Sequence, residues 1–138
     1  SNVASSRGYI KTLLGRKRRF NMWEPRDSWG ERAYSLSEAH SHYPKQELKR
    51  AYTHTAMNAL IQGSSADITK AAMIKIYEAG LLDEIDLKLT VHDELDFSIP
   101  WSKQKCFEDS LQIMKTCVDL KVPLTVDVEK GDSWGTIK

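Results

Sequence analysis

The sequence predicts an α+β fold in which an antiparallel sheet is covered by helices on one face. Two short runs of alternating apolar and polar residues, 87–91 and 95–99, follow each other so closely that they predict a β-hairpin. A third alternating run at 124–128 predicts a last strand. Apolar residues recur near the 3.6-residue period over 45–79 and 102–120, which predicts two helices. Strands and helices in this order are typical of the α+β class.

The length and composition fit one ordinary globular domain or a piece of a larger one. The chain has 138 residues, of which 41% are hydrophobic and 28% are charged. No apolar run approaches the ~20 residues of a membrane span and no signal peptide opens the chain, so we expect a cytoplasmic protein without a membrane partner. Cys106 and Cys117 lie too far apart on one predicted helix for a disulfide. We expect both to be buried, apolar and reduced.

The net charge of +1 hides an uneven distribution of charge. Residues 1–50 hold 11 Lys and Arg against 5 Asp and Glu, and residues 51–138 hold 9 against 14. A basic first third favours a polyanionic partner, and an acidic remainder offers carboxylates for a metal ion. A solvated, charged surface is the plainer interpretation of the same counts.

Residues 8–20 predict a second hairpin at the N-terminal end, with a strongly basic second strand. Tyr9 and Ile10 favour strand, and Gly15 marks the turn. Four consecutive cations follow this turn, namely Arg16, Lys17, Arg18 and Arg19. They have two interpretations of equal weight at this point: charges that protect a strand edge, or a clamp for the phosphate backbone of nucleic acid.

Residues 21–46 show no clean period and predict a long, partly ordered loop. Bulky or turn-forming residues interrupt every pattern there, at Trp23, Pro25, Trp29, Gly30 and Pro44. Loops of this length usually serve a function or a partner. His40 and His42 are too few to predict a metal site without further ligands.

Residues 45–79 carry the helical period and predict one long helix or two joined helices. The apolar positions are Met57, Leu60, Ile61, Ile68, Ala71, Ala72 and Ile76. Gly63, with Ser64 and Ser65 after it, is expected to kink the helix or to separate it into two. Gly80 is expected to end it as a C-cap.

Another face of this helix carries uncharged hydrogen-bonding side chains. His54, Asn58 and Gln62 stand at positions i, i+4 and i+8, which places them on one side of a helix. Solvated helix faces usually carry Lys and Glu, so this stripe favours recognition. Asn and Gln both donate and accept hydrogen bonds, which suits a minor groove, where correct base pairs present acceptors at similar places.

The turn of the hairpin at 87–99 has an unusual composition. Two-residue turns favour Asn-Gly, Asp-Gly or Gly-Gly because they need positive φ, yet this turn is His92-Asp93 and Glu94 begins the next strand. We expect a turn with an imidazole and two carboxylates to present them to a ligand, although an ordinary polar turn is the alternative. Ser102 is the predicted N-cap of the helix over 102–120.

These features together supply the groups that metal-assisted phosphoryl transfer on nucleic acid requires. It needs cations for the backbone, neutral hydrogen-bonding groups for the groove, and carboxylates that hold Mg²⁺ near the reacting phosphate. Mg²⁺ keeps several waters, so one or two carboxylates suffice for each ion.

Four segments resemble motifs of family A DNA polymerases, the bacterial DNA polymerase I type. Residues 91–95, VHDEL, resemble the third polymerase motif of that family. Residues 58–67, NALIQGSSAD, resemble its preceding helix, N-x-x-x-Q-G-[ST]-[AS]-A-D. Residues 8–18, GYIKTLLGRKR, resemble its G-Y-x-x-T-x-x-G-R-[RK] segment. Residues 123–134, with PLTVDV, a glycine and a tryptophan, resemble its C-terminus.

The resemblance implies roles for the residues of the VHDEL hairpin. Asp93 would be one of two metal-binding aspartates of the palm, Glu94 its nearby and less essential carboxylate, and His92 a neighbour of the primer terminus. The hairpin and the C-terminal strand would then belong to the palm sheet. The cofactor would be Mg²⁺ in a two-ion site.

The resemblance also implies contacts with DNA. Asn58 and Gln62 would lie at the primer–template minor groove or the template. His54 stands where cellular members often carry Arg, and some phage members are similar to this chain at that position, which favours a phage-type enzyme. The four cations would lie near the duplex backbone, at Arg16, Lys17, Arg18 and Arg19. A phage-encoded enzyme would act in the cytoplasm of a bacterial host.

Two motifs of the family do not occur in the sequence. They are D-Y-S-x-I-E-x-R, with the other metal aspartate, and R-x-x-x-K-x-x-x-F/Y-G, which grips the incoming nucleotide. We therefore expect residues 1–138 to be a partial polymerase domain, the C-terminal palm side, with residues 21–46 as a loop insertion. Its partners would be primer–template DNA, dNTP and the remainder of the polymerase, which completes the metal site.

Several consequences and alternatives follow. Alone, the fragment is expected to be inactive, and its uncovered surfaces favour self-association. A non-catalytic, duplex-binding remnant of a polymerase is the main alternative. A nuclease that uses Asp93 and Glu94 is a more remote one.

Overall fold

The computed structural model describes residues 2–27 and 30–137 and is α+β, as predicted. Trp29, one of the residues that interrupt the periodic patterns over 21–46, lies outside the described ranges. The chain divides into two compact units, residues 1–67 and 68–138. No helix of the described part of the chain is long and apolar enough to cross a membrane.

The first unit opens with a helix that was not predicted, followed by the predicted basic hairpin. Helix α1 (Asn2–Arg7) precedes strands β1 (Tyr9–Lys11) and β2 (Lys17–Arg19). The strands pair antiparallel, and Gly15 in their connection has a φ of +87°. A left-handed residue is least strained as glycine, so the turn forms where Gly15 permits it.

A small apolar core holds α1 against this hairpin. Ala4, Phe20 and Ala56 are buried together, and Ile10 of β1 packs against them. Phe20 is 3% exposed and is the largest side chain of the cluster. Burial of an aromatic side chain contributes roughly 1.5–3 kcal/mol, so Phe20 fixes β2 to the rest of the unit.

The segment 21–46 contains regular structure, which corrects the prediction of a loop. Strand β3 (Trp23–Pro25) pairs antiparallel with β4 (Leu48–Arg50), and helix α2 (Leu36–His42) lies between them in the chain. The strands are too short for an alternating pattern to be recognised. The start of α2, however, is a capping box in which the Ser35 backbone N–H donates to Glu38 Oε2 at 3.2 Å. Ser35 Oγ donates to the same oxygen at 2.6 Å, and this side-chain hydrogen bond lowers the pKa of the Glu38 carboxyl.

Helix α3 (Ala56–Glu78) is continuous but begins later than predicted. Residues 45–55 form instead β4, a left-handed residue at Tyr52 (φ +61°) and the 3₁₀ helix η1 (Thr53–Thr55). The Lys- and Glu-rich run before Ala51 favours helix intrinsically, and its pairing with β3 overrides that preference. Two separate helices do not form at Gly63, while Gly80, with a φ of +70°, ends α3 as predicted.

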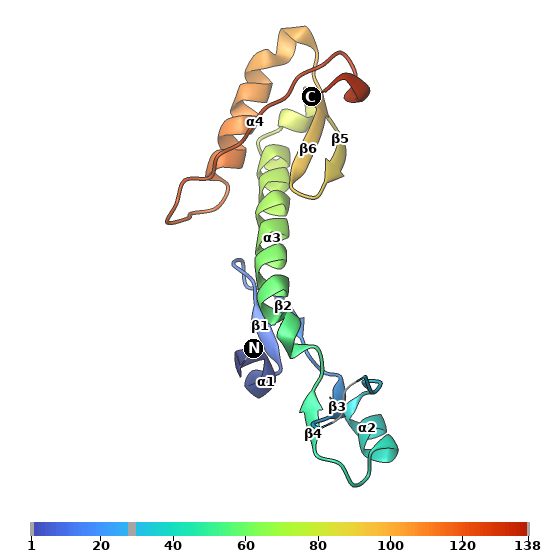
Figure 1. Ribbon diagram of the computed structural model, residues 1–138. Helices are drawn as coiled ribbons and strands as arrows, with labels where there is room; N and C mark the ends of the chain where they lie inside the picture. The colour runs from blue at the N-terminus through green and yellow to red at the C-terminus, as the bar shows by residue number, and fades with distance from the viewer. Residues whose placement is uncertain (1, 28–29, 138) are drawn as a thin grey trace. The chain divides into compact units, whose positions relative to one another are not determined.

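The second unit is built around the predicted hairpin of β5 (Asp86–Val91) and β6 (Glu94–Ser98), which follows the 3₁₀ helix η2 (Leu81–Asp83) (Figure 1). A bulge between Leu87 and Leu89 shifts the register. Leu87 consequently pairs with Phe97, whereas Leu89 pairs with Asp96. Paired residues share a face, so the alternating leucines of β5 do not all lie on one face.

Two terminal elements of the second unit differ from the prediction. Helix α4 (Gln104–Thr116) is shorter than the expected 102–120, and Ser102 lies in the 3₁₀ helix η3 (Trp101–Lys103) rather than at the N-cap of α4. Lys103 occupies that position without a side-chain cap. Residues 124–128 form no strand, because a strand requires a hydrogen-bonded neighbour and no described strand pairs with them. The chain then forms the 3₁₀ helix η4 (Trp134–Thr136).

The core of the second unit contains Ile76, Ile85 and one of the two cysteines. Cys117 is 5% exposed, and its thiol lies 3.3 Å from the carbonyl oxygen of Met114. Burial raises the pKa of this thiol, so it stays protonated and apolar, as expected. Cys106 is only half-buried, and both thiols are free.

Candidate nucleic-acid interface and metal-binding turn

The basic hairpin of the first unit is attached to α3 by polar contacts of its turn. The Arg16 guanidinium donates from Nε to Asp67 Oδ1 at 2.8 Å and from Nη2 to the Gly63 carbonyl at 2.9 Å. Thr12 Oγ1 donates to the other carboxylate oxygen of Asp67. Figure 1 shows the hairpin alongside the first half of α3. Arg16, which the sequence placed among the DNA-binding residues, is thus engaged in internal contacts.

The register of this hairpin sorts its cations onto two faces. Tyr9 pairs with Arg19 and Lys11 pairs with Lys17, so these four side chains share one face. Lys17 Nζ lies 4.9 Å from the centroid of the Tyr9 ring. Ile10 pairs with Arg18 on the other face, where the core lies. The face of Lys11, Lys17 and Arg19, called the cationic face below, is exposed.

Lys11 is a candidate that sequence reasoning missed. It is exposed and directly opposite Lys17 across the hairpin. The signal was present, because a turn centred near Gly15 already pairs residue 11 with a residue of the basic run. Like charges opposite each other destabilise a strand pair, and an anion bound between them would relieve that repulsion.

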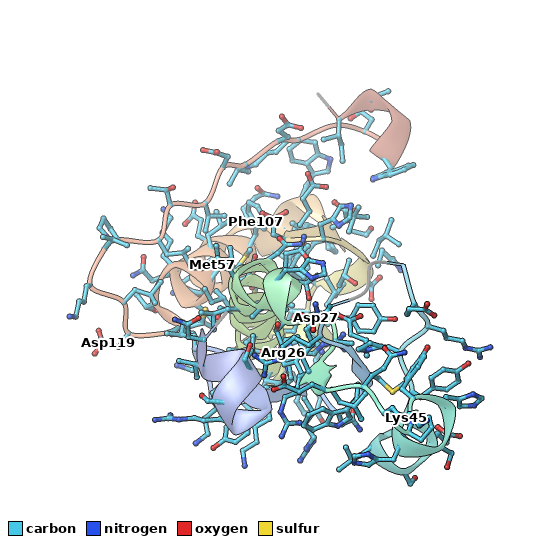
Figure 2. All side chains as sticks on the ribbon, turned by 60° about the horizontal axis from the view of Figure 1, so that its bottom comes forward. Arg26, Asp27, Lys45, Met57, Phe107 and Asp119 are labelled. Carbon is cyan, nitrogen blue, oxygen red and sulfur yellow. The ribbon has the colours of Figure 1, made fainter. Side chains whose placement is uncertain are left out.

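The predicted stripe of neutral side chains is only partly helical. Asn58 and Gln62 are exposed and lie one turn apart on α3, whereas His54 belongs to η1. His54 is exposed as well but does not continue the helical row. Figure 2 marks Met57 near the start of α3, and this side chain is 65% exposed. The first half of α3 therefore presents both amide and apolar groups to its surroundings.

The turn of the second unit has the geometry that was predicted for it. Val91 pairs with Glu94, so His92 and Asp93 alone form the connection. His92 has a φ of +54°, the left-handed region that ordinary side chains avoid. His92, Asp93 and Glu94 are all exposed. The turn thus holds two neighbouring carboxylates at the surface on a conformation that glycine would adopt with less strain.

The donors of this turn fit part of a Mg²⁺ site. Carboxylate oxygens are hard ligands, and Mg²⁺ commonly takes one or two of them together with water and substrate phosphate. Within residues 2–27 and 30–137 no group of three or more His, Cys, Asp or Glu side chains could hold a metal ion. Asp93 and Glu94 can therefore provide one side of such a site and need further ligands for the other.

The two sets of candidate residues belong to different units. Arg16, Lys17, Arg18, Arg19, His54, Asn58 and Gln62 lie in residues 1–67. His92, Asp93 and Glu94 lie in residues 68–138. Among these candidates, the cations and neutral amides thus lie in the first unit, and the carboxylates lie in the second.

The strain at His92 leads to a testable prediction. His92→Gly should raise the free energy of unfolding by about 0.5–1 kcal/mol, because relief of left-handed strain of about 1–2 kcal/mol exceeds the greater entropy of glycine in the unfolded chain. Urea unfolding followed by circular dichroism measures this change. Tyr52→Gly, at the other positive φ of a non-glycine residue (+61°), is the matched control. A loss of stability in His92→Gly alone would show that the imidazole makes stabilising contacts in the turn.

The family model and the relatives that match this chain all point to one family of proteins. The family model for DNA polymerase family A matches residues 1–136. A DNA-directed DNA polymerase of Pseudomonas phage M6 is 42% identical over 132 residues, which cover 96% of this chain and 16% of that protein. DNA polymerase I of Bacillus subtilis is 36% identical over 95% of this chain and 13% of its own length. DNA polymerase theta of Drosophila melanogaster is 34% identical over 99% of this chain and 6% of its own. The chain spans about a sixth or less of these relatives.

Proposed function

The chain belongs to DNA polymerase family A, and on this premise we propose that it is part of a DNA-directed DNA polymerase that performs template-directed nucleotidyl transfer. The observation that carries the proposal is the exposed His92-Asp93 turn with Glu94 beside it. A two-residue turn needs positive φ, but glycine or asparagine would meet that need with less strain than His92. Strain at a non-glycine residue is typical of functional sites.

The roles of the turn follow from its chemistry. Asp93, with Glu94 as a secondary ligand, would hold Mg²⁺. A bound Mg²⁺ ion would neutralise the charge that develops on the reacting phosphate. His92 lies next to these carboxylates and would contact the primer terminus as a hydrogen-bond donor. The ligands that complete a two-ion site come from outside these 138 residues.

The first unit would bind the primer–template duplex. The cationic face supplies charge for backbone phosphates, and Arg18 adds a further exposed cation on the same strand. Asn58 and Gln62 offer donors to minor-groove acceptors, with His54 as a neighbour ahead of α3. This arrangement contacts any correct duplex, as a replicative enzyme requires.

The remainder of the polymerase is the proposed protein partner. Met57 and Ile61 are adjacent on α3 and are 65% and 62% exposed. Neighbouring apolar side chains that are exposed together are typical of a surface that contacts another protein segment. We propose that the rest of the polymerase domain, which would also bind dNTP, covers them, and we expect the isolated chain to self-associate. A phage enzyme among the relatives supports a parent protein that works inside a bacterial host cell.

The proposal predicts that these 138 residues bind duplex DNA but do not extend a primer. Primer extension with Mg²⁺ and all four dNTPs measures the second part, and fluorescence anisotropy with a labelled primer–template measures the first. Robust nucleotide addition by the chain alone would show that it needs no ligands from elsewhere. Affinity for the duplex that is independent of salt, or no affinity, would contradict the DNA-binding role of the first unit.

A further inference from the structure

The contact between the basic hairpin and α3 is centred on one buried carboxylate. Asp67 is 6% exposed, and its two oxygens accept hydrogen bonds from different side chains of the hairpin, Thr12 and Arg16. Thr12 immediately follows β1 and Arg16 immediately precedes β2. The same carboxylate therefore holds both strands at the end where the turn joins them.

The backbone of α3 is shaped to let the hairpin approach. A Cβ at Gly63 would lie 2.8 Å from Thr12 Cγ2, closer than side chains tolerate. Ser64 Oγ accepts a hydrogen bond from the Leu13 amide at 3.0 Å. Gly63, Ser64 and Asp67 thus form one continuous receptor on α3 for the turn. This use of Gly63 differs from the helix break that the sequence predicted there.

Stability alone gives little reason for a charged group at this position. Ionising a buried carboxylate costs desolvation, and an apolar residue of similar size in such a site often gives equal or greater stability. A carboxylate with two directional partners, by contrast, fixes one orientation. The orientation that it fixes is that of β1 and β2, which carry the cationic face, relative to α3, which carries Asn58 and Gln62.

We infer that Asp67 is a positioning residue of the proposed nucleic-acid interface: it holds Lys11, Lys17 and Arg19 in one register with the amides of α3, so that a duplex meets both at once. Asp67 does not contact the nucleic acid itself. It acts through Arg16 and Thr12, whose side chains hydrogen-bond to Asp67 and thereby hold the hairpin on α3. The inference rests on the proposed function for its ligand, a duplex with a phosphate backbone.

The first test measures hairpin docking without DNA. In Asp67→Asn the amide of Leu13 should exchange with solvent at least about tenfold faster, because its partner Ser64 lies on α3. The Ala51 amide, which donates to Met22 in the same unit, should keep its exchange rate. Glu47→Gln removes another carboxylate bound to an arginine, that of the exposed Arg26–Glu47 pair, and is the matched control. Unchanged protection of Leu13 in Asp67→Asn would overturn the inference.

The second test measures how the duplex is held. Loss of register of three cations should lower the slope of log affinity against log salt concentration by up to about 2.7 in Asp67→Asn. The loss should be non-additive with Lys17→Ala and Arg19→Ala, since Asp67 affects binding only by positioning those cations. If Asp67→Asn only destabilised the fold, a smaller fraction of molecules would bind DNA, but the slope of log affinity against log salt concentration would equal that of the parent. That result would overturn the inference.

A second variant keeps the test independent of the buried charge. Gly63→Ala retains Asp67 and favours helix, but its methyl group pushes Thr12 away from α3. It should reproduce the faster exchange of Leu13 and the smaller salt slope. Parental behaviour of Gly63→Ala in both measurements would count against the docked hairpin. A parent chain without salt-dependent binding would instead contradict the proposed interface, and the positioning role with it, whatever the exchange rates.

Discussion

Asp93→Asn should lower the single-turnover rate of nucleotide addition at least about 10²-fold in a chimera that carries this chain in place of the matching segment of the phage M6 polymerase. This phage polymerase is 42% identical to the chain over 132 residues, so the replaced segment can be aligned along nearly the whole chain. Asparagine keeps the size of the side chain and removes its charge. The loss corresponds to about 3 kcal/mol of transition-state stabilisation.

The same hairpin provides the control for Asp93. Asp86 lies at the opposite end of β5, is 67% exposed and pairs with Lys88 at 2.9 Å. Asp86→Asn should leave the rate within about threefold, because exposed ion pairs contribute little. Glu94→Gln should fall between the two variants if Glu94 is a secondary ligand. Full activity of Asp93→Asn would remove Asp93 from the mechanism.

The variant with Lys11, Lys17 and Arg19 all changed to Ala should lose most of the salt dependence of duplex binding. Three phosphate contacts predict that the parent's affinity falls about 40-fold more than the variant's when salt rises from about 50 to about 200 mM. Fluorescence anisotropy across this range measures both slopes. The variant should still fold, since these side chains are exposed and lie opposite the core.

A charge-matched variant separates local contacts from net charge. Lys105, Lys115 and Lys121 are exposed cations of the second unit, and changing them to Ala removes the same charge. Their loss should leave the salt slope close to that of the parent. Equal slopes for both triple variants would show that only the net charge of the chain matters, and the cationic face would lose its role.

The parts of the fold that were predicted correctly are those whose signals are local. The β5–β6 hairpin follows from two alternating runs and a connection too short for anything else. Gly80 was recognised as the end of α3 because a left-handed residue there favours glycine. The capping box at Ser35 is an equally local signal, so α2 could have been predicted from the sequence.

The parts that were missed depend on partners distant in the chain. Leu48–Arg50 favours helix by composition and becomes a strand only because Trp23–Pro25 pairs with it. The alternating run at 124–128 has no such partner among the described residues and stays irregular. The bulge at Lys88 leaves no mark in composition, so the division of the β5 leucines between two faces was not foreseen.

The candidate site shows the same division. The exposed carboxylates of the His92-Asp93 turn could be predicted from the sequence, because two residues between two paired strands must form the connection at the end of the hairpin. The internal role of Arg16 does not, because the sequence brings it near Asp67 only through docking of the hairpin on α3. A run of four cations therefore looked uniform in the sequence, although its members have different surroundings.

Primer extension by the unsubstituted chimera shows whether this chain forms a working part of a family A polymerase. The matched comparison is the phage enzyme without the segment, assayed on the same primer–template with Mg²⁺. We expect template-directed addition by the chimera and none by the deleted enzyme. A chimera that folds and binds the primer–template, yet adds no nucleotide at any Mg²⁺ concentration, would contradict this expectation.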